Sequence, residues 1–486
     1  MCAAAAPVRY LSTRDPRPRP ATHSFEDVLL AGLAADGGLY VPDHLPPLPA
    51  EMLDSFAGLA YPELAAQIMA RFAGDAFRPT EWRTLTDAAY AGFAHRAVAP
   101  LVQIDERLWL LQLFHGPTLA FKDLALQLVG RLFDTVLARR GERMTIVGAT
   151  SGDTGSAALA ACRDREAIDL FVFYPQGRIS EVQRRQMTTI AAANTHAVAI
   201  DGTFDDCQDL VKALFADREL CEALNLGAVN SINWARIAAQ TVYYFAAAAA
   251  LGGMRRPVSF SVPTGNFGNV YAGHIARRIG LPVERLVIGT NRNDILARYL
   301  AAGEMAIAAV EPSLSPSMDI QVSSNFERLL FELKGGNGAA VAEAMRSFRS
   351  DGRLPADEQA WRAARGLFSA HKVDDTRTVQ TIADTYARTG MLIDPHTAIA
   401  VAAARAELAV SAGGADAGEI PMVALATAHP AKFPDAVERA TGVRPEPPPA
   451  LAALFDKPER SVVLPADLAK VKEFVRARAR RAGAAA

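Results

Sequence analysis

The sequence predicts an α/β fold in which buried parallel strands alternate with helices, preceded by a mostly helical N-terminal region. From about residue 100 onward, short apolar runs recur, each followed by a glycine-containing loop and then a helical segment. Continuous apolar runs of this length are typical of parallel strands that are buried on both faces. The first hundred residues instead show helical periodicity, over 25–35 and in segments between 61 and 93.

The alternation of strand, loop and helix can be followed along the chain. Ligands of such sheets bind beyond the carboxyl ends of the strands, so the loops that follow the strands are where we expect a site. The predicted strands are 108–114, 144–148, 170–174, 197–200, 257–262, 285–289 and 422–428. The predicted helices are 120–139, 156–161, 181–187, one that ends near Phe215, and 270–279.

This pattern divides the chain into three regions. Residues 1–98 form the mostly helical N-terminal domain, in which the helix over 25–35 ends at Gly37 and Gly38 and an extended segment follows. Residues 99–440 form the α/β region, with a smaller subdomain over about 140–230 inserted in the larger one. Residues 441–486 form a proline-rich linker and a basic helix over 466–481, which we expect to be a solvated surface helix.

Composition favours a protein that acts on small molecules. Of the 486 residues, 50% are hydrophobic and 21% are charged, as in an ordinary globular protein. Lys and Arg together number 51 against 53 for Asp and Glu, so no basic excess favours binding to nucleic acid or to a membrane. The most apolar stretch, 241–251, is too short to cross a bilayer.

The cysteines predict a cytoplasmic protein without a metal site. Cys2, Cys162, Cys207 and Cys221 have neither CxxC spacing nor histidines at metal-ligand intervals. Thiols of this kind stay reduced in the cytoplasm. The N-terminal residues lack the basic and apolar regions of a signal peptide.

Lys122 is the first residue that can carry chemistry. It is the only lysine before Lys212 in an arginine-rich chain, and a lysine amine can act as a nucleophile whereas a guanidinium cannot. It lies in the first turn of a predicted helix, where the helix dipole and burial both disfavour the ammonium form. A surface lysine at a helix start is the alternative interpretation of this residue alone.

Two loops between a strand and a helix are suited to anions. In PTGNFGN (263–269) the glycines let the backbone approach a ligand, and the N–H groups at the helix start can cradle a phosphate. The loop matches neither a Walker A motif nor GxGxxG. In ATSGDTG (149–155) hydroxyl and N–H groups suit a carboxylate. Each loop alone could also be a plain turn or a helix cap.

A fourth feature is the strand end at Thr427, whose hydroxyl can bond a ring nitrogen or simply close the strand. A phosphate loop, a carboxylate loop, an isolated lysine and a strand-end hydroxyl together fit a pyridoxal phosphate (PLP) site that acts on an amino acid.

Taken in order, these segments resemble the threonine synthase family over nearly the whole chain. The most specific are SFEDVLLAGLAADGGLYVP (24–42) and FHGPTLAFKD (114–123), and cysteine synthase and threonine dehydratase lack this N-terminal region. The other matching segments are RYLSTR (9–14), GATSGDTGSAA (148–158), NSINWARI (230–237), PTGNFGN, SPSMDIQVSSNFERLLFE (315–332), DPHTAIA (394–400) and ATAHPAKF (426–433). The resemblance implies PLP fold type II, the tryptophan synthase β-like fold, with two parallel-type open sheets flanked by helices.

The resemblance also implies the site residues. Lys122 would bind the cofactor as a Schiff base and act as the catalytic base, and Thr427 would bond the pyridine nitrogen. Asn269 stands where the family often has Asp. The residues that would cradle the cofactor phosphate are Gly265, Asn266, Phe267, Gly268 and Asn269. The residues that would contact the substrate are Ser151, Asp153 and Thr154 at its α-carboxylate, and Asn291, Asn293, Ser317 and Lys432 as candidates at its phosphate.

The implied reaction converts O-phospho-L-homoserine and water to L-threonine and phosphate, the last step of threonine biosynthesis, in a monomer or homodimer. One amine would move protons between adjacent carbons of the substrate. Three alternatives remain open: a PLP lyase that eliminates without rehydration, a PLP-binding regulatory protein without turnover, and a metal-dependent hydrolase, for which the sequence offers no ligand cluster.

Overall fold

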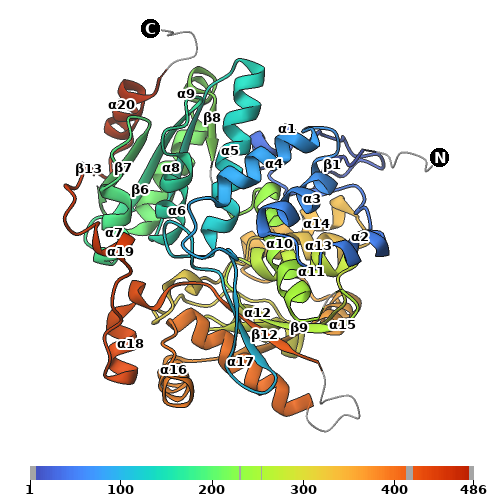
Figure 1. Cartoon of the computed structure of the whole chain (residues 1–486). Coiled ribbons are helices and arrows are strands. Elements are labelled where there is room, and N and C mark those ends of the chain that lie inside the picture. Colours follow the sequence, from blue (N-terminus) through green and yellow to red (C-terminus); the bar gives the residue numbers. More distant parts are fainter. Residues whose placement is uncertain (1–6, 229–230, 253, 412–419, 481–486) are drawn as a thin grey trace.

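A six-stranded sheet forms the larger half of the α/β body in this computed structural model, which describes residues 7–228, 231–252, 254–411 and 420–480 (Figure 1). Its strand order is β11-β10-β9-β12-β4-β3, and every neighbouring pair is parallel except β3 and β4. The strands are β3 (Leu101–Gln103), β4 (Leu108–Gln112), β9 (Val258–Pro263), β10 (Val283–Thr290), β11 (Phe368–Lys372) and β12 (Met422–Ala426).

A five-stranded sheet of order β13-β7-β6-β5-β8 forms the smaller half, and all of its neighbouring pairs are parallel. Two parallel-type open sheets flanked by helices confirm the predicted fold class. The strands are β5 (Met144–Ala149), β6 (Ile168–Pro175), β7 (Thr195–Asp201), β8 (Leu226–Ala228) and β13 (Val462–Pro465).

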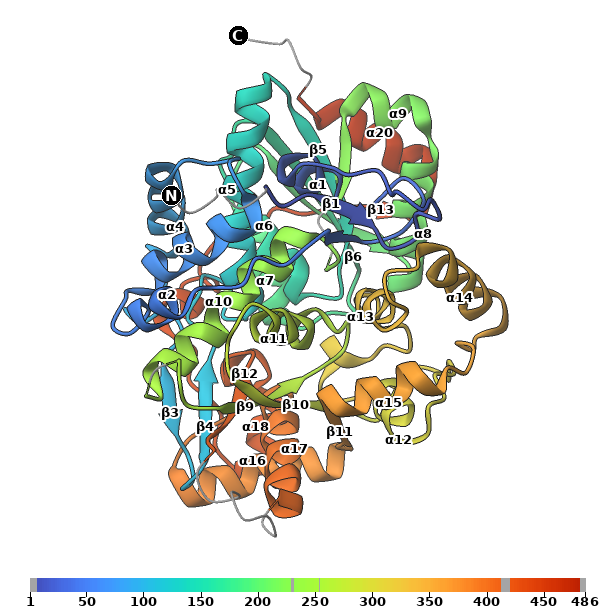
Figure 2. The ribbon, with the colours of Figure 1, turned by 90° about the vertical axis from the view of Figure 1, so that its right-hand side faces the viewer.

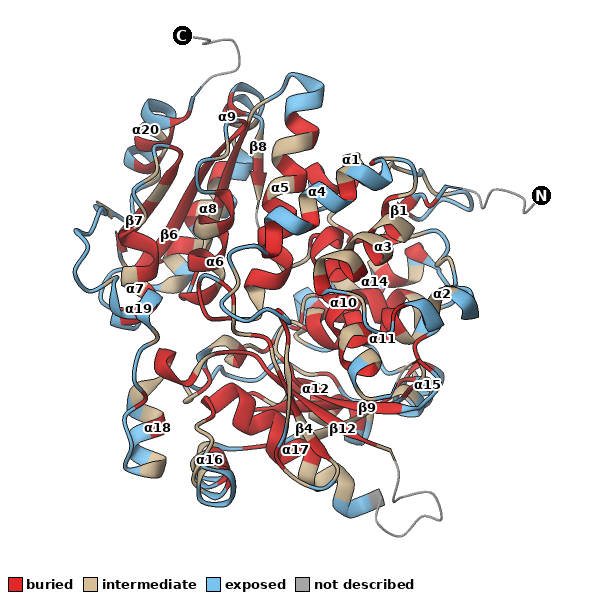
Figure 3. Cartoon of the chain, in the orientation of Figure 1, coloured by how far each residue is buried: buried red, intermediate tan, exposed pale blue. Residues whose placement is uncertain are grey.

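The helices cover both sheets (Figure 3). The apolar stretch over 241–251 belongs largely to α10, which is buried between the N-terminal helices and α11. Within the described part of the chain, no helix is both long and apolar enough to cross a membrane. Helices of the α/β body are α5 (Lys122–Arg140), α6 (Asp153–Cys162), α7 (Glu181–Thr188), α8 (Phe204–Ala216), α9 (Arg218–Leu224), α10 (Trp234–Ala250), α11 (Gly268–Arg278), α12 (Ile295–Ala302), α13 (Phe326–Leu333), α14 (Gly338–Asp351), α15 (Glu358–Leu367), α16 (Asp375–Thr389), α17 (Pro395–Ser411) and α18 (Pro434–Thr441).

The N-terminal region is a two-stranded ribbon with four helices packed on α5 and α10 (Figure 2). The Tyr10 ring of the ribbon lies 5.9 Å from the Trp234 ring at the start of α10. This contact joins the ribbon to the α/β body. The elements are β1 (Tyr10–Ser12), β2 (Tyr40–Pro42), α1 (Phe25–Ala31), α2 (Ala50–Ser55), α3 (Tyr61–Ala73) and α4 (Pro79–Tyr90).

The C-terminal segment corrects one expectation. Beyond the short helix α19 (Pro449–Ala452), β13 pairs with β7, and α20 (Leu468–Arg478) packs against α8. The helix is therefore not simply a solvated surface element, because Val471, Phe474 and Val475 are buried in the core beside the small sheet. Its basic residues obscured this apolar face in the sequence.

Four cysteines were expected to be reduced. Cys162, Cys207 and Cys221 are free thiols, and the first two are buried. Cys2 lies outside the described residues, as does residue 230 of the NSINWARI segment. Among the described residues, no group of three His, Cys, Asp or Glu side chains could hold a metal ion.

Candidate active site

Lys122 is the first residue of α5, and the segment before it runs beside the carboxyl end of β12. The Phe121 N–H donates a 2.8 Å hydrogen bond to the Thr427 carbonyl, and the His429 N–H donates to the Leu119 carbonyl at 3.1 Å. The two chemistry-bearing residues predicted from distant parts of the sequence, Lys122 and Thr427, therefore stand on neighbouring segments. The Thr427 side chain is buried, and no described residue is hydrogen-bonded to its hydroxyl.

A buried carboxylate lies between two lysines at this place. The Asp153 Oδ2 atom is 3.6 Å from Lys122 Nζ, and Asp153 Oδ1 is 2.8 Å from Lys432 Nζ. Lys432 is completely buried and also donates to the Thr118 carbonyl at 2.8 Å. Gln183, from α7, donates to Asp153 Oδ1 at 3.0 Å. Asp153 thus joins α6 of the small sheet to residues of the large one.

The burial of Lys122 favours its neutral amine. Burial is the main cause that lowers the pKa of Lys122, and the nearby cations Lys432 and Arg236 lower it further, whereas Asp153 acts in the opposite direction. For Asp153, burial alone opposes ionisation, but Lys432 and Lys122 outweigh it and lower the pKa of the carboxyl. The site therefore keeps one ionised carboxylate beside an amine that releases its proton more easily than a free lysine.

The loop between β9 and α11 presents unpaired donors. Within the described chain, no residue accepts a hydrogen bond from the backbone N–H of Gly265, Asn266 or Phe267. Phe267 has a left-handed backbone, with φ of 64°, at the start of α11. A Cβ at Gly265 would lie 3.1 Å from the Ser317 carbonyl, so glycine suits this close approach. Successive free N–H groups at a helix N-terminus fit a phosphate.

Asn269 provides a further test of that fit. Its Oδ1 accepts hydrogen bonds from the hydroxyls of Tyr243 at 2.6 Å and Tyr244 at 2.9 Å, which fixes the direction of the amide. The Nδ2 atom is buried and has no partner among the described residues. An unpaired buried donor beside the loop fits an acceptor-rich group such as a phosphate, so asparagine suits the position where the family often has aspartate.

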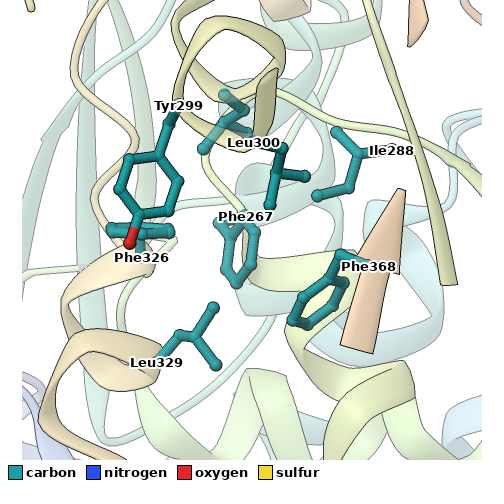
Figure 4. A pocket seen from close by; sticks show the side chains of 8 residues that line it. Phe267, Ile288, Tyr299, Leu300, Phe326, Leu329 and Phe368 are labelled. Atoms are coloured by element: carbon teal, nitrogen blue, oxygen red, sulfur yellow. The ribbon is translucent and has the colours of Figure 1, made fainter. Parts of the chain in front are cut away.

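The Phe267 side chain points away from the loop into the core. Its ring lies 5.4 Å from the Phe326 ring and 5.6 Å from the Phe368 ring, and Ile288 and Tyr299 complete the apolar surroundings (Figure 4). Any contact of this residue with a phosphate therefore comes from its backbone N–H, not from its side chain.

The predicted carboxylate loop needs one correction. Ser151 is exposed and Thr154 is half-buried, so both can reach a ligand. Asp153 does not suit an anion through its side chain, because its carboxylate would repel it and is already paired with two lysines. The loop is shaped by Thr150, whose Oγ1 accepts from the Gly152 and Gly155 N–H groups at 3.0 and 2.9 Å.

The side-chain amides of Asn291 and Asn293 are hydrogen-bonded within the protein. Both are buried, and the Asn291 Nδ2 atom donates to Ser313 Oγ at 2.8 Å and to Asp319 Oδ1 at 2.7 Å. Asn293 Nδ2 donates to the Glu311 carbonyl at 2.8 Å. These amides organise the loop over 311–321, which carries Ser317, and have few free positions for a ligand. The Lys432 ammonium likewise forms an ion pair with Asp153.

Sequence reasoning missed His396, which lies beside Ser317. The Ser317 N–H points to His396 Nε2 at 3.4 Å, and His396 Nδ1 is 2.7 Å from Asp394 Oδ2. Ser317 Oγ also lies 3.5 Å from Asp153 Oδ2. The signal that could have identified this pair is the DPH sequence that opens α17 after a short loop. Ser317 is the candidate at the substrate phosphate that the structure leaves near Lys122.

Fold and site together define a PLP-dependent enzyme, and a family model described as "Pyridoxal-phosphate dependent enzyme" matches residues 94–353. Models described as "Threonine synthase N terminus" and "Threonine synthase, C-terminal" match residues 9–90 and 397–475. The chain belongs to the threonine synthase family, as its sequence segments predicted.

Individual relatives agree over the full length. A threonine synthase of Pseudomonas aeruginosa is 55% identical over 469 residues, which cover 96% of this chain and 98% of that protein. The crystal structure of a PLP-bound threonine synthase from Brucella melitensis has a TM-score of 0.93 and 49% identity, and the match covers 97% of this chain and 100% of that one. The yeast threonine synthase structure has a TM-score of 0.91 and 38% identity, with 98% and 99% covered.

Proposed function

We propose that this protein converts O-phospho-L-homoserine and water to L-threonine and phosphate, with PLP as cofactor and Lys122 as its attachment point and catalytic base. The observation that carries the proposal is the position of Lys122. Its amine, with a pKa lowered by burial, stands on the segment beside the Thr427 strand end and next to a buried carboxylate. Full-length similarity to threonine synthases supports the choice of reaction.

The cofactor would be held by three groups of this chain. The N–H groups of 265–269 and the free Nδ2 of Asn269 receive its phosphate, and Thr427 donates its hydroxyl to the ring nitrogen as a neutral partner. Lys122 provides the covalent bond. When bound, PLP supplies an electron sink that acidifies the carbon atoms next to the substrate's amino group.

Lys122 then moves the protons of the reaction. Released from its covalent bond, the neutral amine takes a proton first from Cα and then from Cβ of the substrate, and phosphate leaves Cγ. The ammonium returns one proton to Cγ and, after the hydroxyl of water has added at Cβ, one to Cα; the second proton of the water leaves with the phosphate. Asp153 stabilises the ammonium form at 3.6 Å, while Lys432 and Arg236 favour the neutral form. These opposing influences suit a group that acts in turn as base and acid.

The substrate would be oriented by its two anionic ends. The hydroxyls of Ser151 and Thr154 with the N-terminus of α6 receive the α-carboxylate. Ser317 contacts the departing phosphate. Lys432 acts at a distance, since it is paired with Asp153 and contributes positive charge to the site without touching the phosphate.

Product analysis tests the proposed reaction. Purified protein should release phosphate and threonine in equal amounts from O-phosphohomoserine, and Lys122→Ala should abolish this turnover. Lys212→Ala is the matched control, since Lys212 is exposed and pairs with Asp209 at the surface. Phosphate accompanied by 2-oxobutyrate and ammonia would identify a lyase without rehydration. Cofactor binding without any turnover would identify a regulatory protein instead.

We further propose a cytoplasmic protein, monomeric or homodimeric, in which residues 1–98, 99–440 and 441–486 are the three regions and about 140–230 is the inserted subdomain. The free thiols of Cys162 and Cys207 support a reducing compartment. Light scattering coupled to size-exclusion chromatography decides between the two oligomeric states, and a larger assembly would contradict both.

A further inference from the structure

The segment 323–325 is hydrogen-bonded to two carbonyl groups of the loop over 263–269, those of Gly265 and Asn266. Ser323 Oγ donates to the Gly265 carbonyl at 2.7 Å. Asn325 donates twice to the Asn266 carbonyl, from its backbone N–H at 3.1 Å and from its side-chain Nδ2 at 2.9 Å. The side chains of both residues are buried. The loop that offers free N–H groups on one side is thus fixed by its carbonyls on the other.

Peptide geometry links these two sides. In a planar trans peptide the C=O and the N–H point in opposite directions. Since the Gly265 carbonyl points to Ser323, the N–H of Asn266 points away from that segment, and the Asn266 carbonyl likewise sets the N–H of Phe267. The apolar surroundings of the Phe267 ring hold the left-handed turn that follows (Figure 4). The direction of the donors is therefore set by Ser323 and Asn325.

Arg328 in turn fixes the amide of Asn325. Its Nη1 donates to Asn325 Oδ1, which leaves Nδ2 facing the Asn266 carbonyl. The remaining guanidinium donors bond backbone carbonyls, Nε to Tyr40 at 2.9 Å and Nη2 to Ile232 at 2.5 Å. Arg328 is completely buried, and its guanidinium lies 5.7 Å from the Trp234 ring. No carboxylate takes part in these three bonds; each one directs a neutral acceptor.

The N-terminal ribbon supports this arginine through two of its segments. The Tyr40 carbonyl belongs to β2, and β1 leads directly into Thr13 and Arg14. Both residues bond the neighbour of Arg328 on α13: Thr13 Oγ1 donates to Glu327 Oε1 at 2.6 Å, and Arg14 forms a bidentate ion pair with the Glu327 carboxylate at 2.8 and 2.6 Å. Family segments that carry no chemistry of their own, RYLSTR, GGLYVP and SSNFER, therefore meet at one place.

We propose that Arg328 and Asn325 are positioning residues for the cofactor phosphate, through which the N-terminal ribbon orients the N–H groups of Asn266 and Phe267. This inference rests on the proposed PLP site. It gives the N-terminal region a task in cofactor binding that the region performs without touching the cofactor.

The affinity of the full-length cofactor-free protein for PLP and for pyridoxal, which lacks the phosphate, tests the proposal. Loss of a positioned phosphate contact lowers the preference for PLP, whereas general loosening weakens both ligands alike. The preference for PLP is expressed as the Kd for pyridoxal divided by the Kd for PLP. Asn325→Ala should reduce this ratio about tenfold. Arg328→Lys keeps the positive charge but cannot form the three hydrogen bonds of the planar guanidinium, and it should also reduce the ratio.

Asn194→Ala is the matched control. Asn194 is equally buried and its Nδ2 bonds three backbone carbonyls, of Cys162, Arg165 and Ile168, in the small sheet. It should lower thermal stability without changing the preference for PLP. If Asn325→Ala does not fold, Ser323→Ala removes only the hydroxyl on Gly265 and should lower the ratio several-fold, by roughly the free energy of one hydrogen bond.

An unchanged ratio in the folded variants, or an equal fall in Asn194→Ala, overturns the positioning role. If wild-type protein binds PLP and forms threonine, but the variants have the same ratio of Kd values as wild type, only the positioning role is contradicted. Wild-type protein that fails to bind PLP would sink the proposed function itself.

Discussion

Replacement of Asp153 by Asn tests the buried charge network most sharply. At 3.6 Å from Lys122 and 2.8 Å from Lys432, the carboxylate attracts each ammonium by about 5 kcal/mol at an effective dielectric constant of about 20. Desolvation offsets much of this attraction, and breaking a buried pair costs about 3–5 kcal/mol net, because a charge stays buried without its partner. We therefore expect Asp153→Asn to lose about 3 kcal/mol of unfolding free energy.

The measurement is urea denaturation of the cofactor-free protein at pH 7. Because the pKa of Asp153 is lowered in the folded state, its contribution is complete above the unfolded value near pH 4 and disappears only as pH falls below it. A second readout is the pH dependence of Lys122 labelling by an amine reagent. The label should react at lower pH in Asp153→Asn, since Asp153 is the group that raises the pKa of Lys122.

Asp169→Asn serves as the control for both readouts. Asp169 is buried in the small sheet and pairs with Arg480 at 2.6 Å, away from the site. Its loss should lower stability but leave the labelling of Lys122 unchanged. Stability of Asp153→Asn within about 1 kcal/mol of wild type, together with an unshifted labelling profile, would refute the network as described.

Three further predictions concern the surroundings of the site. Phe267→Ala should lose about 3–5 kcal/mol of stability in thermal or urea unfolding, since its buried ring packs among the apolar side chains of Figure 4; a loss below about 1 kcal/mol would argue against that packing. Burial lowers the pKa of His429 to about 4, so the unfolded chain binds a proton at higher pH than the folded one; stability should fall by about 2.5 kcal/mol between pH 6.5 and 4, and His429→Gln should remove that part of the pH dependence. Asn291→Ala should cost about 2 kcal/mol by leaving buried acceptors unpaired and should raise KM more than it lowers kcat; an unchanged KM would separate the loop over 311–321 from substrate binding.

The positions of Lys122 and Thr427 were predictable because Thr427 directly follows an apolar strand and Lys122 begins the helix after another apolar strand and its loop. Strand ends of a parallel sheet gather at one edge, so periodicity alone brings distant residues together. The free N–H groups of the loop over 263–269 were predictable for the same reason, since glycines between a strand and a helix mark the place where backbone N–H groups are free. These parts of the site depend on local pattern.

The bonding partners of Asn291, Asn293 and Lys432 were not predictable from pattern. Whether a polar side chain faces a ligand or a neighbouring loop depends on which acceptors surround it, and those of Asn291 come from 313–319, a segment without periodicity. Arg328 shows the same limit, because nothing in its helix distinguishes a completely buried arginine from a surface one. Strand β13 was missed because four residues after a proline-rich stretch carry too little signal.

Which lysine binds the cofactor is the central question, because the structure places two amines on one carboxylate. Reduction of the PLP-loaded protein with borohydride converts a Schiff base into a stable amine, and mass spectrometry of the peptides then locates it. We predict a phosphopyridoxyl group on the peptide that contains Lys122 and none on the peptide that contains Lys432. A label on Lys432, or no label on either lysine, would contradict it.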